Sequence, residues 1–150
     1  MLPRFWKLSQ GIGHFDYQSI LQTISSGLVY VHNDTKAKAT SSKTQAQDFN
    51  EAPIGDYFYL THGNKGIYLL GQLSGPSNVF STKGEGWLDR PFRLIKPSIT
   101  HDSYKGTHKW WAPSDNSTFT VVPTDELQLF EKEILVPYFG IVLAKFGIGI

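Results

Sequence analysis

Hydrophobic residues change from alternating to helical spacing along the first part of the chain. Residues 5–9 alternate as a short strand does, and the glycines of residues 10–13 are typical of a turn. A helix is predicted next, with its cap, apolar stripe and end at Asp16, Ile20, Leu21, Ile24 and Gly27. Residues 28–32 then predict a second short strand.

A long polar segment separates this first unit from a hairpin. Residues 33–51 are rich in Lys, Ser, Thr and Gln, which favours a binding loop in which Asp48 and Phe49 close a short helix. Residues 57–61 and 67–73 predict two strands joined by a turn that contains Gly and Asn. This hairpin is the strongest β signal in the chain.

Two further strands and a second helix are predicted in the last part. The strands cover residues 92–95 and 119–122. The helix covers residues 124–135, begins at the capping residue Thr124, and is expected to end before Pro137, because proline cannot continue a helix.

The order of these elements predicts an α+β fold. Five or six short strands with two helices suit a small curved sheet, or a partly closed barrel, with the helices packed outside it. We predict one domain over residues 4–136. Residues 137–150 are apolar and punctuated by Gly, and we interpret them as the start of a linker to a following domain.

Composition narrows the class of protein. The chain has 150 residues, of which 40% are hydrophobic and 18% charged, as expected for one globular domain. It contains no Cys, which excludes disulfides and thiolate chemistry. Neither a signal-peptide pattern nor an apolar run of membrane-spanning length occurs, so we expect a cytoplasmic protein that does not bind membranes.

No combination of residues predicts catalysis. The five His have no two-His helical spacing and no Cys accompanies them, which argues against a zinc site. His62 lies in the predicted turn of the hairpin, where we interpret it as solvent-exposed. Nucleophile elbows, phosphate loops and dinucleotide fingerprints do not occur. We therefore expect neither an enzyme nor a bound metal or cofactor.

Aromatic residues point instead to binding. They make up 14% of the chain, and Trp6, Tyr30, Trp87, Trp110 and Trp111 fall at predicted strand ends or in loops. Such rings can stack on nucleobases. The net charge of +1 is too small for binding by charge alone, although the segment between Asp34 and Asp48 carries only lysine charges.

Short motifs resemble the EVE and YTH branch of the PUA-like families. The first is Arg4-Phe5-Trp6-Lys7-Leu8-Ser9, an aromatic pair followed by lysine and serine. A Gly-Asp pair, a hydrophobic strand and a histidine follow over residues 54–62, with a partner strand over 66–73. Residues 117–126 resemble the closing strand, proline and acidic helix start. The resemblance covers most of residues 4–135.

This resemblance implies recognition of a modified base. Tyr30 stands where YTH domains have a Trp that forms one wall of an aromatic cage, and Trp87, or else Trp110 or Trp111, follows as a second wall. The base pocket would comprise Ser9, Gln10, Tyr30, Val31, His32, Trp87, Trp110 and Trp111. Phosphates would be contacted by Lys36, Lys38, Lys43, Lys105 and Lys109.

The leading hypothesis is a reader of methylated cytosine or adenine in DNA that flips the marked base into this pocket. The resemblance also implies a restriction complex of the McrBC type, in which the domain is fused to, or acts with, a nucleoside-triphosphate-driven subunit. DNA is favoured over RNA as the partner. The alternatives are a reader of modified RNA, and a module that binds a protein or a small ligand.

Overall fold

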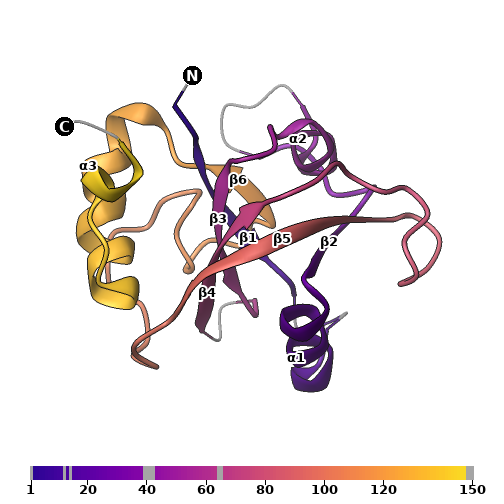
Figure 1. Cartoon of the computed structure of the whole chain (residues 1–150), viewed down its shortest axis with the longest axis horizontal. Helices are drawn as coiled ribbons and strands as arrows, with labels where there is room; N and C mark the ends of the chain where they lie inside the picture. The colour runs from indigo at the N-terminus through magenta and orange to yellow at the C-terminus, as the bar shows by residue number, and fades with distance from the viewer. Residues whose placement is uncertain (1, 12, 14, 39–42, 64–65, 148–150) are drawn as a thin grey trace.

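A curled sheet of six strands forms the centre of the computed structural model (Figure 1), which describes residues 2–11, 13, 15–38, 43–63 and 66–147. The strands are β1 (Phe5–Ser9), β2 (Leu28–His32), β3 (Tyr57–Thr61), β4 (Ile67–Leu73), β5 (Trp87–Pro97) and β6 (Phe119–Val121). Their order is β2-β5-β4-β3-β1-β6, in which β1 and β3 are parallel and the other pairs antiparallel. The predicted α+β class and curved sheet are confirmed.

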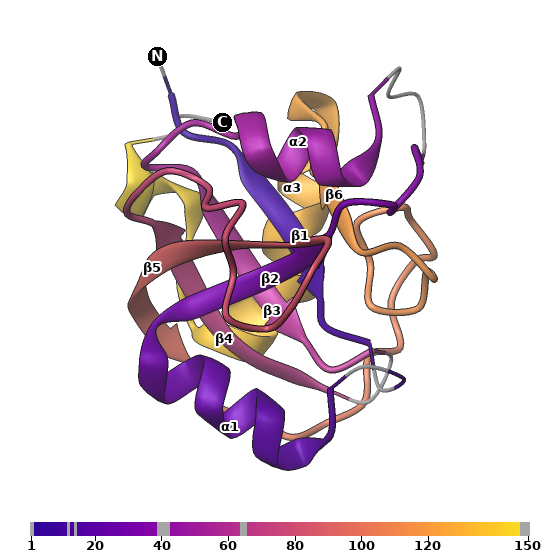
Figure 2. The same cartoon turned by 90° about the vertical axis from the view of Figure 1, so that its right-hand side faces the viewer.

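Helices cover both faces of this sheet. They are α1 (Tyr17–Ser26), α2 (Gln45–Glu51), η1 (Thr124–Glu126), α3 (Leu127–Phe130), η2 (Glu131–Phe139) and η3 (Leu143–Phe146). In Figure 2, α3 lies behind the sheet, whereas α1 and α2 lie near its opposite ends. No helix within the described part of the chain is long and apolar enough to cross a membrane.

Local signals placed the first helix and most strands correctly. The Oδ1 atom of Asp16 accepts a hydrogen bond of 2.8 Å from the backbone N–H of Ser19, and Gly27 ends α1 with φ +72°. The strands predicted at residues 5–9, 28–32, 57–61 and 67–73 coincide with β1 to β4. Both cap and strand signals depend on neighbouring residues only, which explains this agreement.

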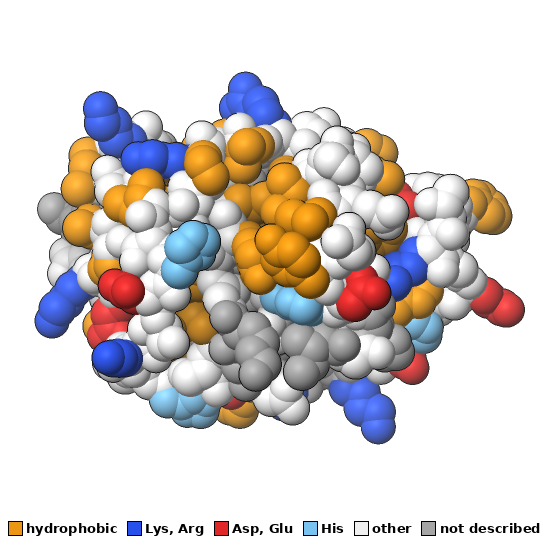
Figure 3. Space-filling model, turned by 90° about the horizontal axis from the view of Figure 1, so that it is seen from below, with side chains coloured by type: hydrophobic (Ala, Val, Ile, Leu, Met, Phe, Trp, Pro, Cys, Tyr) orange, Lys and Arg blue, Asp and Glu red, His pale blue; other side chains and the backbone are white. Residues whose placement is uncertain are grey.

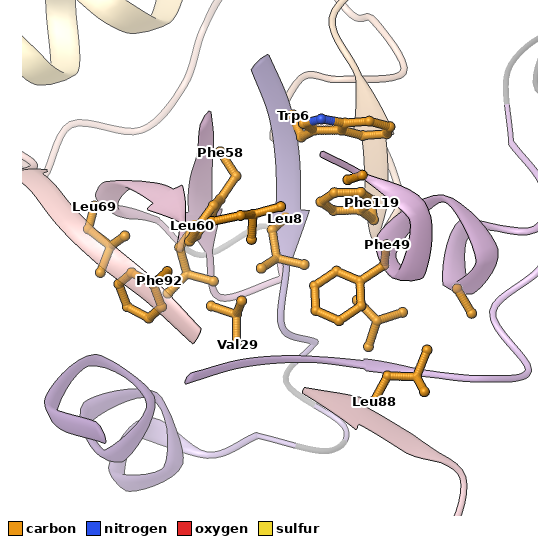
Figure 4. Packing of buried hydrophobic residues seen from close by; sticks show 14 residues of the cluster. Trp6, Leu8, Val29, Phe49, Phe58, Leu60, Leu69, Leu88, Phe92 and Phe119 are labelled. Carbon is orange, nitrogen blue, oxygen red and sulfur yellow. The ribbon is translucent and has the colours of Figure 1, made fainter. Parts of the chain in front are cut away.

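The side chains of β1 alternate between two cores. Trp6 and Leu8 point to the core under α2, where Trp6 stacks on Phe119 with ring centroids 4.2 Å apart (Figure 4). Phe5 points to the core under α3 and η2. Lys7 is fully buried, and its Nζ donates to the backbone oxygen of Asp115 at 2.7 Å. Burial lowers the pKa of Lys7 to about 8.

The polar segment contains more helix than predicted. Residues 45–51 form α2, whose N-cap is Thr44 and whose Phe49 is fully buried. The side-chain oxygen of Gln45 accepts hydrogen bonds from the backbone N–H groups of Thr118 and Phe119, at 2.7 and 2.8 Å. The helix therefore covers the edge of β6, a long-range role that sequence patterns do not reveal.

Strand β5 is longer than the strand predicted at residues 92–95, and the part that was not predicted contains a buried arginine. Arg90 is 1% exposed. Its guanidinium donates to the carbonyl oxygen of Gly75 at 2.9 and 3.0 Å, of Phe49 at 2.9 Å and of Ala52 at 2.6 Å. The charge therefore lies inside the fold with its donors satisfied, although a charged residue argues against a buried strand in sequence.

Residues 137–147 belong to the packed domain, although a linker was predicted from residue 137 onward. Pro137 does not end the helix: it lies inside the π-helix η2, which ends at Gly140 with φ +64°. Phe139 and Leu143 are fully buried. The ring of Phe146 lies 5.1 Å from that of Phe5. The predicted boundary at 136 is wrong because these apolar side chains complete the core under α3.

We predict that Arg90→Met lowers the free energy of unfolding by at least about 3 kcal/mol, since three buried carbonyls lose a charged donor. Urea unfolding followed by circular dichroism measures the change. Arg93→Met is the matched control: the residue is exposed on the same strand and should change stability by about 0.5 kcal/mol or less. Equal effects of the two substitutions would contradict this role of Arg90.

Leu143→Ala should lower the free energy of unfolding by about 2–5 kcal/mol, because it removes a fully buried side chain. Val142→Ala is its control: that side chain is 45% exposed and should cost about 0.5 kcal/mol or less. The same urea titration compares them. If neither substitution changed the free energy of unfolding, this segment would be a linker, as the sequence predicted.

Candidate functional site

Strands β2 and β5 present one row of side chains away from the core. Val29 and Val31 are buried, while Tyr30 and His32 on the alternate positions are partly exposed. Because the strands are antiparallel, His32 lies opposite Trp87, and Tyr30 lies opposite Asp89. The period of two in a strand therefore places the two predicted aromatic walls on the same face.

Phe15 joins these residues into an aromatic cluster, which we define as Phe15, Tyr30, His32 and Trp87. The centroid of the Phe15 ring lies 6.1 Å from that of Tyr30 and 5.5 Å from that of Trp87. The ring of Trp87 also lies 4.9 Å from that of His32, at an interplanar angle of 88°. The cluster therefore combines residues of two strands and of the loop before α1.

Buried polar side chains hold the cluster in place. Gln10 is 1% exposed; its Oε1 accepts a 3.0 Å hydrogen bond from the backbone N–H of Tyr30, and its Nε2 donates to Oγ1 of Thr23 at 3.1 Å. The Nε2 atom of His62 contacts the carbonyl oxygen of Phe15. His62 is buried, contrary to its predicted exposure, because it supports this loop.

A hollow of about 310 Å³ adjoins the cluster; we call it the Tyr30 pocket. It is lined by Phe15, Ser19, Gln22, Thr23, Tyr30, Thr82 and Lys83. The lining combines aromatic faces with hydroxyl and amide groups. Burial, and then the negative charge of Asp89, raise the pKa of the Tyr30 hydroxyl, so it is a proton donor at neutral pH.

The loop between β4 and β5, residues 74–86, extends along this site, and Figure 2 shows it in front of both β2 and β5. It places the ammonium of Lys83 4.1 Å from the ring centroid of Phe15 and 4.9 Å from that of Trp87. At its tip, Val79 is 61% exposed and Phe80 86% exposed. The loop therefore adds both a cation and an apolar tip to the site.

Trp110 lies in a different hollow, which we call the Trp110 groove. The groove has a volume of about 680 Å³, and its lining includes Arg4, Trp6, Lys38, Lys43, Trp110 and Thr120. The ring of Trp110 is 47% exposed, and Nζ of Lys38 lies 5.8 Å from its centroid. None of the residues that line the Tyr30 pocket lines this groove.

The structure places Trp111 in the core beneath the Trp110 groove, whose lining includes it, and outside the lining of the Tyr30 pocket. Its side chain is fully buried, and its Nε1 donates to Oε1 of Glu126 at 2.7 Å. A ring without an exposed face cannot stack on a base. Its position directly after the exposed Trp110 reflects tertiary packing, which adjacent aromatic residues in sequence do not distinguish.

Three further residues of the predicted base pocket, Ser9, Gln10 and Val31, support the fold instead of lining the Tyr30 pocket. Val31 is 1% exposed and its side chain packs in the core, on the opposite side of β2 from Tyr30. Ser9 is 8% exposed, and its backbone N–H donates to the oxygen of Thr118 at 2.7 Å. The side chain of Gln10 already makes hydrogen bonds to the backbone of Tyr30 and to Thr23. Among the described residues, none of these three lines the Tyr30 pocket.

The predicted phosphate contacts do not form one patch. Lys43 is paired with Glu51 at 2.7 Å and Lys109 with Glu126 at 2.6 Å. Lys105 lines a separate hollow beside Glu133, while Lys38 lies at the Trp110 groove. Lys36 is exposed, and its carbonyl oxygen accepts a hydrogen bond from the side chain of Gln45.

On the face that carries α1, the charged side chains likewise do not gather into one patch. In Figure 3, hydrophobic side chains gather near the middle of this face, and the Lys and Arg side chains stand at its periphery. No group of His, Asp and Glu within the described residues could hold a metal ion. The Tyr30 pocket combines aromatic rings, hydroxyl and amide groups and the Lys83 ammonium.

Phe15 and Lys83 were missed in the sequence. Phe15 lies directly before the N-cap Asp16, where an apolar residue commonly packs against the helix. That signal marks a packed residue but not its partners. Lys83 lies in a loop with no periodic pattern, so only the tertiary structure brings it to the aromatic cluster.

Comparisons with known proteins show similarity in fold alone. No protein-family model matches the chain, and no curated protein sequence matches it. A Leishmania major protein described as hypothetical has a TM-score of 0.53 at 10% identity, covering 87% of this chain and 93% of its own.

Two bacterial proteins solved for structural genomics have similar scores. The NMR structure from Rhodopseudomonas palustris has a TM-score of 0.52 at 11% identity and covers 87% of this chain and 92% of its own. The crystal structure from Agrobacterium tumefaciens has a TM-score of 0.51 at 13% identity and covers 87% of this chain and 93% of its own. These likenesses show that the chain shares its curled α+β fold with these three proteins.

Proposed function

We propose that this chain binds a modified base of DNA, a methylated cytosine or adenine, after the base has been extruded from the stack. The observation that carries the proposal is the aromatic cluster, of which Phe15 and Tyr30 line the Tyr30 pocket. Stacking on an aromatic ring contributes about 1–3 kcal/mol per base. Tyr30 and Trp87 come from two neighbouring strands and are partly exposed, and the buried ring of Phe15 packs against both.

The polar lining suits the edge of a base. Reading an extruded base requires hydrogen bonds to its ring edge as well as stacking. Ser19 and Gln22 on α1 supply a hydroxyl and an amide group to the pocket, and the Tyr30 hydroxyl remains protonated at neutral pH. Each of these groups can both donate and accept, the hydroxyls through one oxygen and the amide through its NH2 group and its carbonyl oxygen, which leaves the identity of the base open.

Phosphate contacts in this proposal come from the Trp110 groove. Lys38 and the half-exposed Arg4 line it together with the exposed ring of Trp110. Phosphate contacts position a strand without specifying its sequence. The proposed partner is DNA, and the motif resemblance adds a restriction complex driven by a nucleoside-triphosphate-hydrolysing subunit. We propose a binding function without catalysis for this chain.

Tyr30→Ala should remove the preference for a marked duplex. We expect the intact chain to prefer one mark, among 5-methylcytosine, 5-hydroxymethylcytosine, N6-methyladenine and 1-methyladenine, by tenfold or more, about 1.4 kcal/mol. Fluorescence anisotropy at two salt concentrations, with unmarked duplex and matched RNA, measures it. Tyr17→Ala, which removes a 58% exposed tyrosine outside the pocket lining, is the control and should retain the preference.

Other outcomes of that titration separate the alternatives. A preference that survives Tyr30→Ala but not Trp110→Ala would place the base in the Trp110 groove. Tighter binding of the RNA strand would indicate a reader of RNA that uses the 2′-hydroxyls. Equal affinity for all duplexes would contradict base reading, and no binding at all would favour a module for a protein or small ligand.

Lys38→Ala should weaken marked and unmarked DNA equally, since a phosphate contact carries no base information. It should also lower the slope of log K against log salt by about one. Lys132→Ala is the control: this exposed lysine lies on η2, away from the groove lining, and should leave the slope unchanged. A selective loss of marked DNA in the Lys38 variant would contradict a phosphate role.

A further inference from the structure

The aromatic cluster of this protein holds a cation of its own. The ammonium of Lys83 lies 4.1 Å from the ring centroid of Phe15 and 4.9 Å from that of Trp87. Both distances are within the range of about 6 Å for cation–π attraction. The two rings stand at 88° to each other, so they form a corner with the ammonium near both.

Hydrogen bonds within the loop hold Lys83 beside the aromatic cluster. The backbone N–H of Lys83 donates to Oγ of Ser81 at 3.2 Å, and that of Gly84 to the carbonyl oxygen of Ser81 at 3.3 Å. Gly86 has φ +86°, and a Cβ there would lie 2.7 Å from Nε2 of His32. The loop can therefore press against the cluster only with glycine at this position.

Carboxylates rather than further lysines adjoin the cluster. Asp89 lies opposite Tyr30 in the strand pair, and its charge contributes after burial to the raised pKa of Tyr30. Oδ1 of Asp34 lies 2.7 Å from Nδ1 of His32. Negative charge beside aromatic faces makes the corner more favourable for a positive group than for a neutral one.

We propose that the base bound here is cationic: a nucleobase whose ring nitrogen is methylated so that the ring itself carries a positive charge. This inference rests on the proposed function and names the class of modification. Any base that enters the corner displaces the Lys83 ammonium. A neutral base loses the cation–π attraction in that exchange, whereas a cationic base restores it and also stacks.

Two isomeric bases test this proposal with charge as the main variable. 1-Methyladenine is protonated and cationic at neutral pH, and N6-methyladenine is neutral with the same atoms. Each is placed once in the same single-stranded DNA, where neither has to be unpaired from a duplex. Isothermal titration calorimetry then gives both affinities, with unmethylated DNA as the reference.

We expect the 1-methyladenine strand to bind at least tenfold more tightly than the N6-methyladenine strand. Trp87→Leu should reduce this ratio towards one, while Trp110→Leu, the same change in the separate groove, should retain it. Lys83→Met should tighten binding of the cationic strand several-fold, because the internal competitor is removed. Lys132→Met is its control and should leave both affinities unchanged.

The two levels of the proposal fail in different ways. A strand with N6-methyladenine that binds as well as, or better than, the cationic one, and better than unmethylated DNA, overturns the cationic preference while leaving base reading intact. Equal binding of all three strands overturns the inference, and with the duplex titration it overturns adenine reading as well. A tenfold preference that Trp87→Leu leaves unchanged would overturn the assignment to this corner.

Discussion

The buried guanidinium of Arg90 is the contact on which the rest of the structure depends. It binds the carbonyl oxygens of Phe49 and Ala52 at the end of α2 and that of Gly75 at the start of the loop that carries Lys83. Burial lowers the pKa of Arg90 because it removes water from the charge, and the carbonyl dipoles take the place of that water. One side chain thereby connects the core, α2 and the loop beside the candidate site.

The two faces of β2 have different roles. Val29 and Val31 fill the core, and Tyr30 and His32 between them face the pocket. Gln10 links the backbone of Tyr30 to Thr23 on α1, so the pocket wall and the helix that supplies polar groups are held together. A change in the core at this strand would therefore alter the pocket geometry as well.

Two aromatic sites, instead of one, have consequences for how a strand could bind. The Tyr30 pocket has ring faces, neutral polar groups and carboxylates nearby, while the Trp110 groove has an exposed indole next to Lys38. The pocket is suited to discriminate a base and the groove to hold a backbone. The polar segment between β2 and α2 contributes Lys38 to the groove and leads from His32 at the pocket, so it connects the two sites along the chain.

Residue patterns alone determined the elements whose signals are local. Alternation predicted β1 to β4, a cap and a glycine bounded α1, and the order of elements predicted the curved α+β sheet, because strand periodicity and helix capping depend on neighbours in the chain.

Only the tertiary structure decided which aromatic residues form a site. Trp110 and Trp111 are adjacent in sequence, yet one is 47% exposed and the other fully buried, because Glu126 and the core under α3 take up the second ring. Phe15 and Lys83 reach Trp87 from two distant loops. Arg90 lies outside the strand predicted at residues 92–95, and Phe139 lies in the predicted linker, because burial depends on partners far along the chain, which a local pattern cannot contain.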